Sequence, residues 1–425
     1  MTMLFDTANT IFWGVLTFSI LILLHEGGHF VAARAFGVKV HEFMMGLPGP
    51  AIRLKTKSTT YGITMIPLGG YVRIAGMEPG PEDEFLGQAL KEISMRGRMD
   101  ALGMSQALGV DAERATAILM TLADWGAVVP SELDDVSYEA TESVTDDADP
   151  AALLDAARKI TYRGLSTTRR ILVLVAGVAV NLLAAILIFT VILSIYGYDV
   201  PSPEISGIAE DSPAAAAGLR EGDTVVAVNG REIEDWYELL NTLAVTRPGE
   251  TGQIRYLRDG TERTASITYG ESPHNGGAYL GITSGELKHV NLNVWESFVT
   301  ALKYTRDTFV MIAAFFNPET FSLVAKNARS VVGVSVEAAN IVEYGRALGY
   351  AQFIALLSLS LGIMNILPIP PLDGGKVLVE IIERVSRRQL ARNVQLGLSL
   401  AGAVLLFSLI GYLMYADVLR YFVNV

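Results

Sequence analysis

The stretch from Ile11 to Ala33 reads IFWGVLTFSILILLHEGGHFVAA. It is about 23 residues long, close to the ~20 that a helix needs to cross a bilayer. No Lys or Arg precedes it and it has no small-residue cleavage pattern, so we do not expect a cleavable signal peptide. The stretch therefore predicts a membrane helix, and its end carries ionisable side chains that such a helix normally lacks.

These side chains form the pattern His25-Glu26-Gly27-Gly28-His29. On a helix, residues four apart share a face, so both imidazoles can bind one ion while the carboxylate of Glu26 reaches a nearby water. Zinc is the natural candidate, since nitrogen ligands with one open position suit a hydrolytic site. HExxH patterns also occur on solvated helix faces without a metal. At membrane depth, however, an ionisable residue costs at least ~2.5 kcal/mol. No structural role requires Glu26 there, so a functional site is the better explanation.

The composition agrees with a membrane protein. Of 425 residues, 51% are hydrophobic and 18% charged, which is too apolar for an ordinary soluble protein and excludes general disorder. The formal net charge is −12, and nucleic acid is not expected as a partner because phosphate binding needs concentrated Lys and Arg. Cysteine is absent, which excludes disulfides and thiolate ligands. The five histidines are at positions 25, 29, 41, 274 and 289.

Three more apolar runs follow, so we expect about four transmembrane helices. The runs are Ile171–Tyr196, about Tyr350–Leu367 and about Leu396–Tyr415. Most Lys and Arg near their ends lie in the links between the first and second runs and between the third and fourth. By the positive-inside rule, loop 34–168 and the later link are cytoplasmic. The N-terminus, residues 197–349 and the C-terminus are then on the opposite side.

Residues 201–283 have the pattern of a small β-rich domain. An alternating stretch, Ile254–Tyr269, is divided by Asp259-Gly260, and an earlier strand is followed by Asn229-Gly230. Both dipeptides favour tight hairpin turns. The SPA, AGL, GD and NG elements between Ser212 and Gly230 resemble a bacterial PDZ module, which binds extended peptides by adding them as a strand. Another small β-rich domain is the alternative.

The expected cytoplasmic loop contains two different segments. Ile63–Met77 reads ITMIPLGGYVRIAGM and predicts a β-hairpin, either on the surface or re-entering to membrane depth, where its backbone groups must be satisfied. Residues 105–125 resemble the two helices of a winged-helix unit. Because residues 94–146 hold three Arg against ten Asp and Glu, a protein-contact or regulatory insert is favoured over one that reads DNA.

Two histidines and a water leave tetrahedral zinc one protein ligand short. The third apolar run leads into NILPIPPLDGG, from Asn365 to Gly375. Its prolines end the helix and its glycines permit a sharp turn behind Asp373. Asp373 is then either a turn or cap residue, or the missing ligand. The expected orientation places it near the same membrane face as His25.

The combined motifs resemble those of the site-2 protease family of intramembrane zinc metalloproteases, in particular the bacterial regulator-of-sigma-E protease type. The resemblance covers most of the chain except about 80–160. It implies that His25, His29 and Asp373 bind one Zn²⁺ per chain and that Glu26 is the general base. It also implies transmembrane protein substrates with a single span, such as anti-sigma factors or signal-peptide remnants.

The resemblance further implies substrate-binding residues. Gly69 and Gly70 match the family's membrane re-entrant hairpin, which presents the substrate as a strand. Asn365 matches an asparagine that holds the substrate backbone or the developing charge. Asn181 matches the asparagine of an AG-P-xx-N pattern in the second span, although Val178 replaces the family's proline.

The expected fold is a polytopic α-helical membrane protein of the bacterial cytoplasmic (inner) membrane, with a membrane re-entrant β-hairpin and an inserted extracytoplasmic PDZ domain of α+β class. Its PDZ domain would capture peptide tails or, as the resemblance favours, exclude folded ectodomains. The main alternative is a catalytically inactive membrane PDZ adaptor, and a transporter is a weaker one. The expected parts are a first helix with the re-entrant segment (1–80), an acidic insert (81–165), a second helix (166–198), the PDZ domain (199–285), a membrane-associated helical segment (286–349) and the last two helices (350–425).

Overall fold

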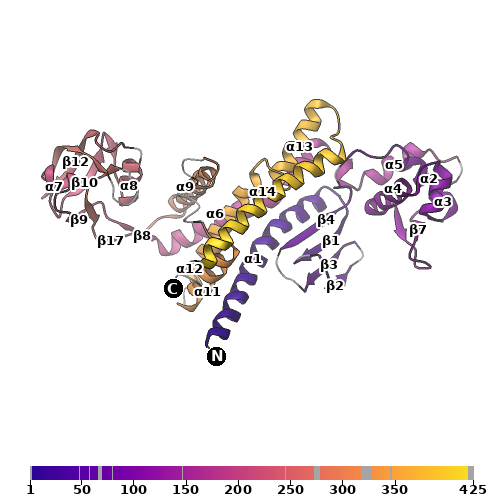
Figure 1. Cartoon of the computed structure of the whole chain (residues 1–425), viewed down its shortest axis with the longest axis horizontal. Coiled ribbons are helices and arrows are strands. Elements are labelled where there is room, and N and C mark those ends of the chain that lie inside the picture. The colour runs from indigo at the N-terminus through magenta and orange to yellow at the C-terminus, as the bar shows by residue number, and fades with distance from the viewer. Residues whose placement is uncertain are drawn as a thin grey trace. The chain divides into compact units, whose positions relative to one another are not determined.

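The computed structural model describes residues 2–46, 48–56, 58–65, 69–78, 80–145, 147–244, 246–271, 278–317, 321, 328–344 and 347–419 (Figure 1). His274 and residues 66–68 of the expected hairpin lie outside this described part. The chain divides into two compact units, which we call the membrane unit (Met1–Phe189 and Thr300–Val425) and the β-rich unit (Thr190–Val299).

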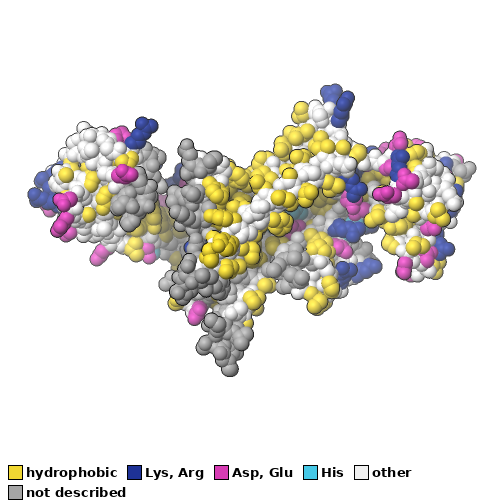
Figure 2. Space-filling model, viewed as in Figure 1, with side chains coloured by type: hydrophobic (Ala, Val, Ile, Leu, Met, Phe, Trp, Pro, Cys, Tyr) yellow, Lys and Arg dark blue, Asp and Glu magenta, His cyan; other side chains and the backbone are white. Residues whose placement is uncertain are grey.

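Four described helices are long and apolar enough to cross a membrane, as many as the sequence predicts. Many apolar side chains of the last one are exposed, including Leu400 at 68% and Phe407 at 71%. Figure 2 shows hydrophobic side chains gathered over α14 and its neighbours. Such a surface fits contact with lipid, since in water it would be unfavourable by about 25 cal/mol per Å². The helices are α1 (Thr2–Ala35), α6 (Thr167–Tyr196), α12 (Ala347–Ile366) and α14 (Arg392–Val418).

In the described part of the segment before α12 lie α9 (Val294–Ala314) and α11 (Val331–Glu343). Helix α11 packs against α1, α12 and α14. Its first turn is capped by the Ser330 hydroxyl, and the backbone N–H of Ser330 donates to the buried carboxylate of Asp417 on α14 at 2.6 Å. Helix α11 is thus anchored among the apolar helices.

A four-stranded sheet follows α1, in the order β2-β3-β1-β4. The expected hairpin over Ile63–Met77 is wrong as a pairing, because β3 and β4 are not neighbours and β1 lies between them. The hairpin is instead β2–β3, while β1 pairs in parallel with β3 and antiparallel with β4. Strand β4 packs against α1, where a Cβ on Gly70 would lie 2.8 Å from Ile22. The strands are β1 (Val40–Met45), β2 (Ala51–Lys55), β3 (Thr60–Thr64) and β4 (Gly70–Ile74).

The acidic insert forms a small domain with its own apolar core. The two helices expected within 105–125 are present as α3 and α4, each with an aspartate at its N-cap, and Gly109 ends α3 with a left-handed backbone. The three strands pair in the order β5-β7-β6, so a helix pair is followed by a β-wing. The elements are α2 (Leu86–Arg96), β5 (Arg98–Asp100), α3 (Ala101–Leu108), α4 (Ala112–Trp125), β6 (Val128–Pro130), β7 (Ser137–Ala140), α5 (Pro150–Arg158) and the 3₁₀ turn η1 (Tyr162–Gly164).

The β-rich unit is built around a sheet in the order β11-β10-β12-β13. Both predicted hairpin turns are confirmed: Asn229-Gly230 joins β10 to β11, Asp259-Gly260 joins β12 to β13, and all four residues have the positive φ that such turns require. Short elements complete the domain. They are β8 (Tyr198–Pro201), β9 (Ile205–Ile208), α7 (Pro213–Ala216), β10 (Thr224–Val228), β11 (Arg231–Glu232), α8 (Trp236–Ala244), β12 (Thr251–Arg258), β13 (Thr261–Thr268), β14 (Gly270–Glu271), β15 (Ala278–Tyr279), β16 (Ile282–Ser284) and β17 (Leu287–Val290).

A buried ion pair stabilises the β-rich unit. The carboxylate of Asp223 is 1% exposed and accepts two hydrogen bonds of 2.7 Å from the guanidinium of Arg258. Burial alone would raise the pKa of Asp223, but the hydrogen bonds from Arg258 and from the backbone N–H of Arg220 outweigh burial, so the pKa is lowered. The folded state therefore favours the charged carboxylate.

We expect Asp223→Asn to destabilise the β-rich unit more than the loss of an exposed ion pair does, because the buried carboxylate gives up its charge and its two charge-assisted hydrogen bonds from Arg258. The stabilisation from Asp223 is complete above the ordinary aspartate pKa of about 3.9, and it is lost as the pH falls toward the lowered folded pKa. Urea unfolding followed by limited proteolysis, at neutral and acidic pH, measures both effects. Glu262→Gln, in an exposed pair with Arg255, is the matched control and should change stability by less than about 1 kcal/mol. Equal stability of Asp223→Asn and wild type at neutral pH would contradict the expectation.

Candidate active site

The two histidines of the HExxH pattern lie on one face of α1, one turn apart and both buried. The ring of His29 is oriented by α6, because its Nδ1 lies 2.8 Å from the carbonyl oxygen of Val173. A carbonyl only accepts, so Nδ1 must carry the proton. In the neutral ring, Nε2 of His29 therefore presents a lone pair on the side facing His25, at 3.4 Å from its Nε2.

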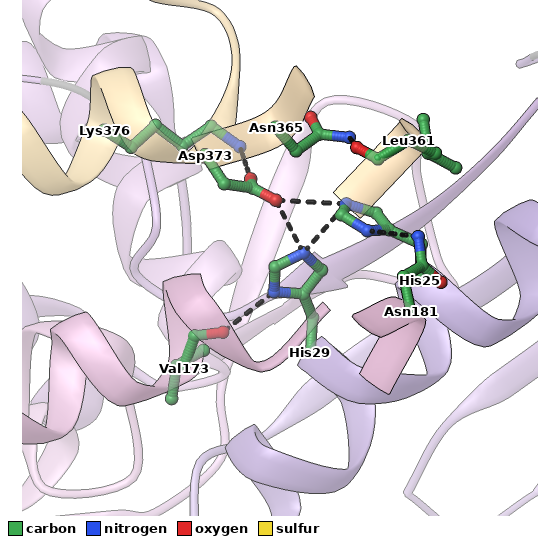
Figure 3. Close-up of polar contacts among 8 residues, drawn as sticks. All are labelled: His25, His29, Val173, Asn181, Leu361, Asn365, Asp373 and Lys376. Atoms are coloured by element: carbon green, nitrogen blue, oxygen red, sulfur yellow. Dashed lines mark hydrogen bonds and ion pairs between the residues drawn. The ribbon is translucent and has the colours of Figure 1, made fainter. Parts of the chain in front are cut away.

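Asp373 completes this group from the other end of the chain (Figure 3). Helix α12 ends at Ile366, as the prolines predict, and α13 (Asp373–Ser386) begins with the aspartate itself. Its Oδ2 lies 3.0 Å from Nε2 of both histidines, and its Oδ1 lies 3.3 Å from Nζ of Lys376. The side chain is thus directed at the histidines.

The three side chains fit a zinc ion. Zn–N distances of about 2.0–2.1 Å place tetrahedral ligands about 3.3–3.4 Å from one another, and the three ligand atoms here are 3.0, 3.0 and 3.4 Å apart. With the proton of His29 donated to Val173, the Nε2 lone pair of His29 and a carboxylate oxygen of Asp373 meet in a buried place, next to Nε2 of His25. A cation relieves that convergence, and nitrogen and oxygen donors are ligands that Zn²⁺ accepts. The group is a candidate metal site by its geometry as well.

Glu26 follows His25 on α1 and is partly buried. Its carboxylate lies within electrostatic range of His29, His25 and Asp373. A carboxylate in this position, beside the ligand atoms but not among them, is suited to exchange protons with a water at the fourth position of the metal.

The site depends on a very close approach of α1 and α6. A Cβ added to Gly28 would lie 2.4 Å from the carbonyl oxygen of Ala176, and one added to Gly177 would lie 2.4 Å from Nε2 of His29. A Cβ on Gly27, by contrast, would meet nothing within 4 Å. Small residues that let two helix backbones approach are typical of contacts between membrane helices. The second glycine of the motif is therefore a packing requirement, and the first is not.

We expect Gly28→Ala to lower zinc affinity and cleavage at least about tenfold, since overpacking of this contact forces backbone shifts and the ligands of α1 shift with it. Gly27→Ala is the matched control and should behave as wild type. Zinc retention after dialysis against a chelator measures the difference. The expectation fails if both variants lose zinc equally, or if neither does.

Of the other predicted residues, Asn181 contacts a histidine of this group, whereas the described contacts of Asn365 and Gly70 are with other residues. Asn181 of α6 is fully buried, with its Nδ2 3.4 Å from Nδ1 of His25. Asn365 donates its amide to the carbonyl of Leu361 one turn earlier in α12, at 3.0 Å, and in this conformation its amide is committed to its own helix. Gly69 has a φ of +95° and precedes Gly70, the first residue of β4.

Sequence reasoning missed two contacts of the site. Lys376 lies three residues after Asp373, a spacing at which helical side chains meet, and this signal was available in the sequence. The carbonyl of Val173 is a backbone group, and its contact with His29 cannot be predicted from the residue type.

Comparison with known proteins places these observations in a family. Residues 13–409 match peptidase family M50. A zinc metalloprotease RasP of Geobacillus kaustophilus is 26% identical over 98% of this chain and 99% of its own length. A zinc metalloprotease RasP of Oceanobacillus iheyensis is 28% identical over 96% and 98%, and a probable protease eep of Enterococcus faecalis is 27% identical over 97% and 100%.

Among solved structures, the PDZ domain of an SdrC-like protein from Listeria innocua is 24% identical and covers 21% of this chain and 99% of its own, with a TM-score of 0.19. The family match spans nearly the whole chain, from α1 to α14. The helices are apolar enough to span a membrane. With the His-His-Asp group buried among them, the chain belongs to peptidase family M50 and is an intramembrane zinc metalloprotease.

Proposed function

We propose that the protease cleaves single-span membrane proteins within or near their transmembrane segments, with His25, His29 and Asp373 as its zinc ligands and Glu26 as its general base. The observation that carries the proposal is the convergence of three donor atoms within 3.4 Å of one another. They come from α1 and α13, next to helices that are long and apolar enough to span a bilayer. A hydrolytic centre placed there acts on chains that are themselves in the membrane.

The side chains have separate tasks in this proposal. When bound, Zn²⁺ supplies a Lewis acid for the scissile carbonyl and the attacking water. Glu26 accepts a proton from that water and delivers it to the leaving amide nitrogen as the C–N bond breaks. Val173 keeps the proton of His29 on Nδ1, and Lys376 holds the second oxygen of Asp373.

A substrate helix must unwind before it is cut, because its carbonyls are hydrogen-bonded to amides four residues ahead. The free edge of β4 supports a way to stabilise the unwound stretch. In the described sheet β4 pairs only with β1, so its other edge, beginning at Gly69 and Gly70, offers backbone groups to a substrate strand. Asn365 would hold the substrate backbone after leaving Leu361. We propose that this sheet re-enters to membrane depth.

The distribution of Lys and Arg supports a topology in which loop 34–168 is cytoplasmic and the β-rich unit is extracytoplasmic, in a bacterial inner membrane. The β-rich unit, with its two confirmed hairpins and PDZ-like signature, would act as a PDZ domain that captures tails or excludes folded ectodomains. Substrates would then include anti-sigma factors or signal-peptide remnants that another protease has already shortened. The acidic insert, whose α4 exposes Glu113, Thr116 and Met120, would contact protein.

The test is cleavage by the purified full chain, in detergent with one equivalent of zinc, of a single-span protein whose span contains a central glycine pair. Mass spectrometry should place the cut within or beside the span. The control is a test protein with the same flanking residues but with a soluble helix in place of the transmembrane span. This control protein should not be cleaved. Binding of the substrate without any product would favour the adaptor instead.

A further inference from the structure

Asn181 has an unusual hydrogen-bond state for a fully buried residue. Its Nδ2 lies 3.4 Å from Nδ1 of His25, and its Oδ1 has no hydrogen-bond partner among the described residues. Buried carboxamide oxygens are normally paired, and an unpaired one in a native structure calls for an explanation. Figure 3 shows the amide directed at the ring of His25, on the side away from Asp373.

The two orientations of this amide correspond to two states of His25. Rotation by 180° exchanges the oxygen and nitrogen with almost no change of shape. As placed, Nδ2 donates to Nδ1, so the ring proton of His25 is on Nε2, which lies 3.0 Å from Oδ2 of Asp373. Once Nε2 is a metal ligand, the proton must be on Nδ1. In the rotated amide, Oδ1 accepts it.

We propose that Asn181 is a positioning residue of the metal centre, whose carboxamide turns to accept the Nδ1 proton of His25 when zinc is bound. The inference rests on the ligand set of the proposed function, and it gives Asn181 a task other than substrate binding. His29 needs no such turn, because the carbonyl of Val173 accepts its proton in either state. The ring of His29 is thus held by the same hydrogen bond in both states. The ring of His25 has a different hydrogen bond with Asn181 in each state.

The backbone and the Cβ of Asn181 contact α12. Its backbone carbonyl accepts a hydrogen bond of 3.0 Å from Ser358 of α12, and a Cβ added to Gly362 of the same helix would lie 3.4 Å from the Cβ of Asn181. The side chain is 0% exposed, so a substrate does not reach it in this conformation. The Cβ of Asn181 is packed, and its amide oxygen has no hydrogen-bond partner among the described residues. The amide is therefore suited to hydrogen-bond its neighbour His25.

Zinc affinity of the full chain in detergent, measured by competition with a chelator, tests this role without any cleavage assay. Asn181→Leu removes the acceptor while keeping the number and branching of the side-chain heavy atoms, and it should weaken zinc binding about 10- to 100-fold, the usual effect of losing such a partner. Asn181→Asp keeps an acceptor for the Nδ1 proton and should bind zinc within a few-fold of wild type. Ser358→Ala disturbs the same helix contact without touching His25 and should bind as wild type.

Nitrogen-15 spectra of the zinc-loaded, histidine-labelled chain provide the second measurement, with His25→Ala identifying the signals. Wild type and Asn181→Asp should show His25 protonated at Nδ1. The inference is overturned if Asn181→Leu binds zinc as wild type does, or if Asn181→Asp loses zinc as severely as Asn181→Leu. If Asn181→Leu does not fold, the result for Asn181→Asp decides. Unchanged zinc binding by His25→Ala would instead refute the ligand set, so the two failures are distinguishable.

Discussion

Glu26→Gln should lower the cleavage rate by about 10²- to 10⁴-fold and leave zinc content at one per chain. Glutamine has nearly the shape of glutamate but cannot accept a proton, so it removes the general base and little else. Glu26 lies beside the ligand atoms rather than among them, which is why the metal should remain. Cleavage of the single-span test protein and metal analysis of the same sample give the two quantities.

Glu42→Gln is a useful companion to this variant, since Glu42 is a carboxylate on β1 that accepts a hydrogen bond from Tyr71 and is not part of the His-His-Asp group. It should cleave nearly as well as wild type. If Glu26→Gln forms product at the wild-type rate, Glu26 is not the base and the mechanism must be assigned to another group.

Asp373→Ala should abolish zinc binding, with an affinity loss of more than about 100-fold, because a ligand is worth more than the outer contacts whose loss costs 10- to 100-fold. Both histidines lose their 3.0 Å partner at once. Chelator competition on the purified chain measures the loss, and cleavage should disappear with the metal. Lys376→Gln, which removes only the contact to Oδ1, should show a smaller reduction.

Retention of one zinc per chain by Asp373→Ala would mean that another residue supplies the third ligand. Asp307→Asn, on the exposed part of α9, removes an acidic charge elsewhere and should leave zinc affinity unchanged.

Much of the fold was predictable because long apolar runs and tight-turn dipeptides act locally. The four spans, the end of α12 before its prolines and both hairpins of the β-rich unit follow from short stretches of sequence. The pairing of β1 with both β3 and β4 was not predictable in this way. It depends on how the sheet packs against α1, where Gly70 meets Ile22, and no local pattern encodes that contact.

The candidate site likewise combines features that local sequence predicts with features that depend on tertiary packing. His25, Glu26 and His29 are visible as a motif because one helix turn brings them together. The approach of Asp373 depends on the packing of α13, and sequence spacing left its role open between a cap and a ligand. The position of Asn181 beside His25 depends on the crossing of α1 and α6 at Gly28 and Gly177. The family resemblance assigned Asn181 to substrate binding, and an asparagine in a membrane helix does not by itself reveal its neighbour.

The separation of the ligands along the chain has a consequence for biosynthesis. His29 and Asp373 are 344 residues apart, and ribosomes add about 5–20 residues per second. Roughly 20 to 70 seconds therefore pass between synthesis of the HExxH helix and of its third ligand. During that interval the nascent chain holds the two histidines and Glu26 but lacks the third proposed ligand. If the proposed ligand set is correct, we expect activity only when nearly the whole chain has been made, so an unfinished copy should not cut its neighbours.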